Sequence, residues 1–455
     1  MEMVLEFLRD VLSQPALLIG IMSCIGLIAL KRPFHKVMTG TLKPILGYLM
    51  LAAGAGVIVN NLDPLGKMIE HGFHITGVVP NNEAIVAVAQ KVLGVETMSI
   101  LVVGLLMNLC IARFTKFKYV FLTGHHSLFM ACLMSAVLGT AGLSGMELIL
   151  VGGFLMGAWS SISPAIGQSY TSKVTDGDEI AIGHFGSLGY YLSAWVAQYV
   201  GKAEDSTEDI EIPEKWGFLR DSTLSTALTM IVFYLIAAFA AGSEFVATLS
   251  GDMSPYLYAV MSAMNFAVGV TIVYSGVRMI LGDLIPAFQG IATKIIPNAI
   301  PAVDCAVFFT YAPTAVVLGF ISSFIGGIIG MLILGAVGGV LIIPGLVPHF
   351  FCGATAGIYG NATGGRRGAA VGAFLNGLAI TFLPALALPV LGQLGFQNTT
   401  FGDADFAVMG LVLGHAFEWI GMAGIYGIVA IAALVLIIPN FIKTKGKVIN
   451  YVEEE

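Results

Sequence analysis

The sequence predicts an all-α, polytopic membrane protein of about eleven transmembrane helices. Of its 455 residues, 57% are hydrophobic and only 11% are charged, and its mean hydropathy is +0.89. Soluble globular domains do not have this balance. Apolar stretches of roughly 20 residues, the length that crosses a bilayer, recur along the chain between short polar or basic segments.

The two ends of the chain predict opposite orientations. Segment 1–14 places its leucines on one helical face, which predicts an amphipathic helix at the membrane surface. The first span, 15–30, ends at the basic cluster 31–36, which should stay in the cytoplasm and leave the amino terminus outside. The lysines of 443–447 put the carboxyl terminus inside, so the number of crossings is odd.

Between these ends, regular spans alternate with irregular pieces. A re-entrant hairpin or half-helix is predicted at 63–90, a second irregular piece at 349–365, and a soluble acidic loop at 201–222. The regular spans are predicted at 43–59, 97–112, 119–143, 146–170, 186–200, 223–248, 256–274, 321–344, 368–396 and 406–438.

Segment 276–320 organises the rest of the chain. It is apolar, but it should not form one continuous helix, because prolines remove backbone donors and clash with the preceding turn. In a membrane, broken helices persist only inside protein or beside water, and transporters build solute sites there. Asp304 lies in this segment among apolar neighbours and is therefore a candidate site residue. The prolines are Pro286, Pro297, Pro301 and Pro313.

Two parts of the chain resemble each other. The stretch that starts at Thr41 aligns with the one that starts at Gly276, which predicts a first repeat at 41–170 and a second at 276–396. An odd number of spans between the copies would invert one relative to the other, as in many transporters. Glu83 and Asp304 would then face each other across one site.

The polar candidates each have a structural alternative. The carboxylates of Asp304 and Glu83 can accept hydrogen bonds from the hydroxyls of a polar solute, or they can cap a broken helix. Neutral imidazole both donates and accepts hydrogen bonds, which suits sugar-like hydroxyls; the alternative is a buried ring bonded to a backbone carbonyl. The imidazoles in question belong to His125, His126 and His184.

Several classes of function lack their signature. The five cysteines form no Cys-x-x-Cys pair, and no His-x-x-x-His, Gly-x-Ser-x-Gly or P-loop motif occurs. The formal net charge is −7, it is spread over tails and loops, and the basic residues form no face of the kind that binds nucleic acid. The sequence therefore predicts no metal site, no cofactor, no catalytic residue and no nucleic-acid partner.

Four strings carry a resemblance to a known family: TGHHSLF, VTDGDEIAIGHFG, GVRMILGDLIPAFQGI and IPAVDCAVFFTYAPTAVVLGF. The chain resembles the membrane-spanning IIC component of the ascorbate-type phosphotransferase system, in the ascorbate/galactitol superfamily. The resemblance implies that 1–455 is a single IIC unit in the bacterial inner membrane, with a periplasmic amino terminus. It also implies inverted repeats, re-entrant hairpins, and a homodimer in which each protomer has a core domain and a V-shaped dimerisation domain.

The resemblance implies L-ascorbate as the solute, passed inward to a separate phosphorylated IIB protein that is supplied by IIA. An ion-coupled secondary transporter of a sugar acid or polyol, with Asp304 as the ion or proton site, is the alternative. The two differ in energy source. The predicted solute ligands are Asn82, Glu83, His125, His126, Phe129, His184, Phe185, Asp304 and Thr355.

Overall fold

The computed structural model describes residues 11, 14–74, 77–80, 82–177, 179–210, 222–392 and 399–441. The predicted surface helix at 1–14 lies almost entirely outside them, as does the second half of the acidic loop. The helices are α2 (Pro15–Ala29), α3 (Phe34–Phe73), α4 (Asn82–Phe114), α5 (Gly124–Thr140), α6 (Gly145–Thr175), α7 (Ser187–Val200), α8 (Ser222–Ala241), α9 (Ser243–Ser250), α10 (Pro255–Lys294), α11 (Pro313–Ala336), α12 (Leu346–Gly392), α13 (Ala404–Ile420) and α14 (Met422–Phe441).

Short extended pieces lie between the helices. They are the strands β1 (Val79–Pro80), β2 (Tyr119–Phe121), β3 (Ala181–Ile182), β4 (Ile300–Val303) and β5 (Thr399–Thr400). The 3-10 helix η2 (Cys305–Thr310) lies between β4 and α11.

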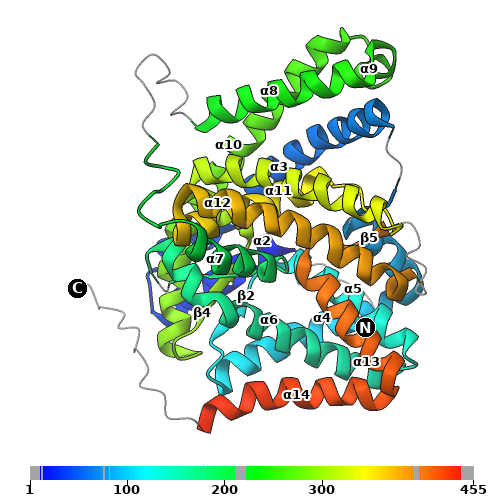
Figure 1. Ribbon diagram of the computed structural model, residues 1–455. Coiled ribbons are helices and arrows are strands. Elements are labelled where there is room, and N and C mark those ends of the chain that lie inside the picture. The colour runs from blue at the N-terminus through cyan, green and yellow to red at the C-terminus, as the bar shows by residue number, and fades with distance from the viewer. Residues whose placement is uncertain are drawn as a thin grey trace.

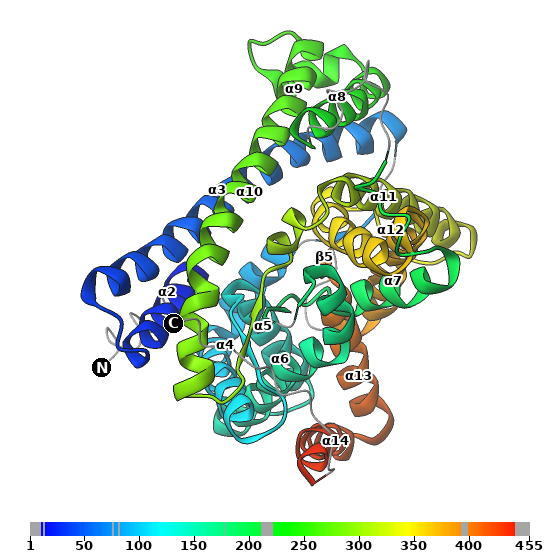
Figure 2. The ribbon, with the colours of Figure 1, turned by 90° about the vertical axis from the view of Figure 1, so that its left-hand side faces the viewer.

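The helices α2, α3, α8, α9 and α10 form an elongated limb beside the rest of the molecule, here called the arm (Figure 2). Its axis is the pair α3 and α10, each 40 residues long. Glycines let the two backbones touch: a Cβ on Gly54 would lie 2.7 Å from the Gly269 carbonyl oxygen, and one on Gly276 would lie 2.6 Å from that of Gly47. Small residues at such positions permit close helix packing in membranes.

The remaining helices form the body of the molecule (Figure 1). Within it, α11 packs along α12 through glycines: a Cβ on Gly357 would lie 2.6 Å from the Ala315 carbonyl oxygen. The prediction that 349–365 is irregular is therefore wrong. Its glycines serve helix packing, and the backbone leaves helical geometry only at Gly364 and Gly365.

Two other expectations about helix breaks differ from the structure. The region 63–90 is expected to break at Pro80, and the chain is extended there at Val79–Pro80, but the region is not a separate hairpin or half-helix, because its two sides belong to the long helices α3, which ends at Phe73, and α4, which begins at Asn82. Likewise α10 continues through Pro286 to Lys294. Neighbouring helices and local adjustment allow transmembrane helices to contain proline. The break predicted for 276–320 therefore occurs only after Lys294.

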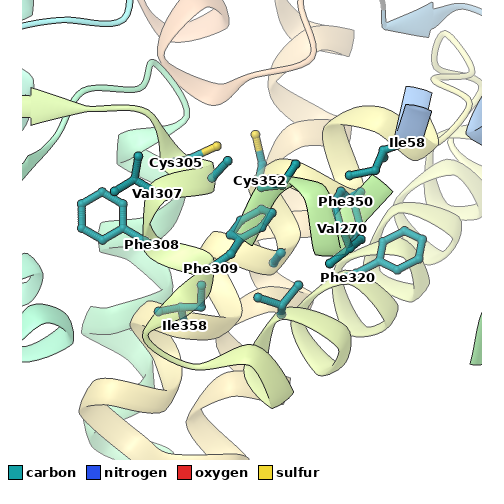
Figure 3. Packing of buried hydrophobic residues seen from close by; sticks show 14 of the residues in the cluster. Ile58, Val270, Cys305, Val307, Phe308, Phe309, Phe320, Phe350, Cys352 and Ile358 are labelled. Carbon is teal, nitrogen blue, oxygen red and sulfur yellow. The ribbon is translucent and has the colours of Figure 1, made fainter. Parts of the chain in front are cut away.

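Apolar packing fixes the interrupted segment in the body. Phe309 of η2 lies edge-on to Phe350 of α12, with ring centroids 5.8 Å apart, and both rings are fully or almost fully buried. Figure 3 shows this cluster, with Cys305 and Cys352 on the two packed elements. Each aromatic ring removes a large apolar area from solvent, so the contact holds η2 rigidly against α12.

Among the described residues, seven helices are long and apolar enough to cross a membrane, or eight if the bent pair of α8 and α9 is one span. The predicted multi-pass, mostly helical membrane architecture is confirmed. The count of about eleven crossings and the internal repeat stay predictions.

Candidate functional site

Parallel strand pairing brings distant polar residues to one place. The strands β2 and β3 both pair in parallel with β4, and β1 pairs in parallel with β5. The carboxyl ends of parallel strands lie at the same edge of a sheet. Asp304 directly follows β4, and His184 and His125 come shortly after β3 and β2. The three predicted ligands therefore converge.

Asp304 has one structural and one site-facing contact. Its Oδ1 atom accepts a hydrogen bond from the Ala306 backbone N–H at 3.0 Å, which caps η2. Its Oδ2 atom lies 3.4 Å from Nε2 of His125. Asp304 is 7% exposed, whereas the His125 side chain is 38% exposed. The cap and the site-facing contact thus use different oxygens.

Tyr48 of α3 extends this contact to the arm. Its hydroxyl lies 3.2 Å from Nδ1 of His125. If the Nε2–H of His125 donates to Asp304, its Nδ1 accepts from the Tyr48 hydroxyl, so the two contacts are consistent with one neutral tautomer. The sequence analysis missed Tyr48, because a tyrosine in an apolar helix gives no local signal of a site.

Backbone donors fix the orientation of the other two imidazoles. The Phe185 N–H donates to Nδ1 of His126 at 3.3 Å, and the Gly186 N–H donates to Nδ1 of His184 at 3.1 Å. The ring centroids of His126 and His184 are 3.8 Å apart. A nitrogen that accepts an N–H carries no proton, so each neutral ring holds its proton on Nε2. Two consecutive amides thus make both histidines Nε2–H donors.

This arrangement bears on metal binding. The triads His126–His184–Asp403 and His184–Asp304–Cys305 each place their ligand atoms within 4.8 Å of one another. A metal-bound neutral imidazole donates the N–H of its other nitrogen to an acceptor. Here Nδ1 of both histidines faces an amide donor. The local bonds favour donation to an oxygen-rich solute over metal ligation, and the absence of a metal stays a prediction.

Two buried acids of the site were missed by the sequence analysis. Asp403 is 5% exposed, and its carboxylate accepts hydrogen bonds from Asn82 Nδ2 at 2.6 Å and Cys352 Sγ at 2.8 Å. Asp405 is fully buried and accepts from the Leu188 N–H at 3.0 Å, at the start of α7. Two acids in the apolar string FGDADF, 401–406, were the available signal.

The structure places the predicted polar ligands Asn82, Glu83 and Thr355 in three different environments. The Asn82 amide is occupied by the 402–403 turn, because its Oδ1 also accepts the Gly402 N–H at 2.9 Å. Glu83 lies in α4, and its side chain is outside the described part of the chain. Thr355 is fully buried in α12 and donates its hydroxyl to the Phe351 carbonyl at 2.7 Å.

The two predicted aromatic ligands line the histidines. The Phe129 ring lies edge-on to His125, with centroids 5.8 Å apart, and is 8% exposed. The Phe185 ring is fully buried and stacks on Phe121 at 4.6 Å. Phe129 therefore forms an apolar wall of the site, whereas Phe185 contributes its backbone N–H.

Comparison with known proteins gives the family of the chain. Residues 10–405 match the family described as EIIC-GAT, PTS system sugar-specific permease component. The chain is also 27% identical, over 416 residues, to a protein of Mycoplasma pneumoniae named "Ascorbate-specific PTS system EIIC component". That alignment covers 78% of this chain and 62% of the relative, so the chain spans less than two thirds of the relative's length. By the extent of the family match, this chain belongs to the sugar-specific permease components of the PTS system.

Proposed function

We propose that this protein is the permease that carries L-ascorbate across the inner membrane for phosphorylation by a separate IIB protein. The observation that carries the proposal is the pair of fixed Nε2–H donors on the adjacent rings of His126 and His184, with a ring nitrogen of His184 within 4.8 Å of the Asp304 carboxylate. The name of the Mycoplasma pneumoniae relative supports the choice of ascorbate within the family.

The chemistry of ascorbate suits this arrangement. Its ring is largely anionic at neutral pH and presents oxygen acceptors, whereas its side chain presents hydroxyl donors. Imidazole N–H groups satisfy the ring oxygens, and the carboxylate of Asp304 accepts from the hydroxyls. The ring of Phe129 covers an apolar face of the solute. The solute is therefore oriented with its ring toward the histidines and its hydroxyls toward Asp304.

The proposed assembly follows the arm and the body. The arm corresponds to the V-shaped domain that forms a homodimer within the lipid bilayer, and the body corresponds to the core domain that holds the solute. Tyr48 belongs to the arm and contacts His125 of the body, which supports a site at their boundary. The amino terminus is outside and the carboxyl terminus is cytoplasmic, where phosphorylated IIB, charged by IIA, receives the solute.

Binding to the purified protein tests the solute. We expect saturable binding of ascorbate and weaker binding of galactitol. His184→Ala should weaken ascorbate binding by about 1–3 kcal/mol, because it leaves polar partners unpaired. His415→Ala is the matched control, since His415 pairs with the exposed Glu418 on α13. Galactitol binding that exceeds ascorbate binding would show that the proposed solute is wrong.

Uptake into membrane vesicles tests the energy source. We expect accumulation of the phosphorylated solute only with phosphoenolpyruvate and the soluble carriers, and no effect of collapsing ion gradients. Uptake of unmodified solute that stops when the gradient is collapsed would instead support the ion-coupled alternative, with Asp304 as the ion or proton site.

A further inference from the structure

Asp403 is a buried acid that the proposed function does not use. It follows β5 and, among the described residues, forms no ion pair with lysine or arginine. Its Oδ2 atom accepts from Asn82 at the start of α4, and its Oδ1 atom accepts from the Cys352 thiol of α12. A buried carboxylate without a cation must gain its stability from such donors. Asp403 therefore joins segments that lie far apart in the sequence.

The direction of these bonds is fixed by the backbone. The Gly402 N–H donates to Oδ1 of Asn82, so Nδ2 of Asn82 must face Asp403. Turning the amide over would set two N–H donors against each other. The parallel pairing of β1 with β5, Pro80 opposite Thr400, holds both segments in this register.

The same network reaches His184. The hydroxyl of Tyr190 lies 2.8 Å from Nδ1 of His184 and 3.5 Å from Sγ of Cys352. Because Nδ1 of His184 accepts the Gly186 N–H and carries no proton, the single proton of the Tyr190 hydroxyl is donated to it, and the Cys352 sulfur lies against the same hydroxyl. Oδ1 of Asp403 also lies 3.9 Å from Nδ1 of His184. Loss of the acceptor at position 403 would release the Cys352 thiol, and a shift of its sulfur would move the Tyr190 hydroxyl and with it the His184 ring.

We propose that Asp403 is a positioning residue of the solute site: through Asn82 and Cys352 it holds the start of α4 and α12 in place, and through Tyr190 it orients His184. The proposal rests on the proposed function, because its consequence is measured as solute affinity. Asp403 itself need not touch the solute.

Exchanging the two side chains provides the test. In Asp403→Asn the single remaining side-chain oxygen serves Asn82, and an amide N–H then faces the Cys352 sulfur, a weak acceptor. In Asn82→Asp two carboxylate oxygens face each other where the donor and acceptor now lie 2.6 Å apart. The double variant carries both substitutions. Its carboxylate at position 82 accepts from the Gly402 N–H and from the amide at position 403, and the oxygen of that amide accepts from Cys352. The bond between the two exchanged side chains is thereby restored with its direction reversed.

We expect the dissociation constant for ascorbate to increase from wild type to the double variant, then to Asp403→Asn, and to be largest for Asn82→Asp. The last should bind at least about tenfold more weakly than wild type, and the double variant should return to within about threefold of it. Affinity is measured below the unfolding temperature of every variant, so that a loss of fold does not enter. A role limited to stability would leave all folded variants with wild-type affinity.

Each outcome decides the proposal. Wild-type affinity in folded Asp403→Asn overturns it, and so does a folded double variant that binds as weakly as the single ones. If one single variant does not fold, the other is compared with wild type and the double variant. If neither folds, Cys352→Ala takes their place, because it removes the thiol between Asp403 and Tyr190, and wild-type affinity in it overturns the proposal. If wild type binds galactitol and not ascorbate, the proposed solute is wrong and the cycle is judged with galactitol. If it binds neither, the proposed function and the positioning role both fail.

Discussion

Replacing Asp304 by asparagine and by alanine separates the two roles of this carboxylate, the cap of η2 and the hydrogen-bond acceptor that faces the candidate site. Asparagine keeps a side-chain oxygen that can accept from the Ala306 N–H, now 3.0 Å from Oδ1, so the cap of η2 survives. It places an amide NH₂ where Oδ2 now lies 3.4 Å from His125. Alanine removes both contacts. The difference between the two variants therefore isolates the cap from the acceptor that faces the site.

The expected magnitudes differ for folding and for binding. Asp304→Asn should leave the unfolding temperature close to that of wild type, whereas Asp304→Ala should lose about 0.5–2 kcal/mol of stability with the cap. Both variants should bind ascorbate about 1–3 kcal/mol more weakly, or roughly 5- to 150-fold, because a buried solute hydroxyl loses its acceptor. Asp304→Asn should accordingly be stable but defective in binding.

The assay combines thermal unfolding with ascorbate binding on the same purified samples. Normal affinity in a stable Asp304→Asn variant would refute the role of solute acceptor and leave Asp304 as the cap of a broken helix. A large loss of stability in Asp304→Asn would instead show that the 3.4 Å contact with His125 holds the fold.

Three further predictions concern the fold and its orientation. Glu208→Ala should lower stability by about 1–2 kcal/mol, since its carboxylate accepts from the first N–H groups of α11, and Glu204→Ala in the same loop is the control for thermal unfolding. Gly365→Ala should cost more than about 2 kcal/mol, because φ is 58° and a Cβ would lie 2.3 Å from a carbonyl oxygen, whereas Gly427→Ala, with nothing within 4 Å, should be tolerated in the same assay. A cysteine introduced at Lys445 should react with an impermeant reagent only after cells are opened, and labelling of intact cells would contradict a cytoplasmic carboxyl terminus.

The sequence alone determined the class of the protein and the region of its candidate site. Hydropathy is a local property, so the membrane-spanning character could be read from the composition and the apolar runs. Ionisable residues are costly in apolar surroundings, which made Asp304, His125 and His184 stand out before any partner was known. The structure then brought these residues to one edge of a parallel sheet.

Only the tertiary structure decided where helices break and what the polar residues contact. Pro64 and Pro286 are potential breaks by local rules, yet packing keeps both inside continuous helices. Asp403 is bonded to Asn82, 321 residues away, and Tyr48 meets a histidine 77 residues away. Such pairings depend on strand register and helix packing, which no local pattern encodes, so the acids and the tyrosine that complete the candidate site became recognisable only once the chain was folded.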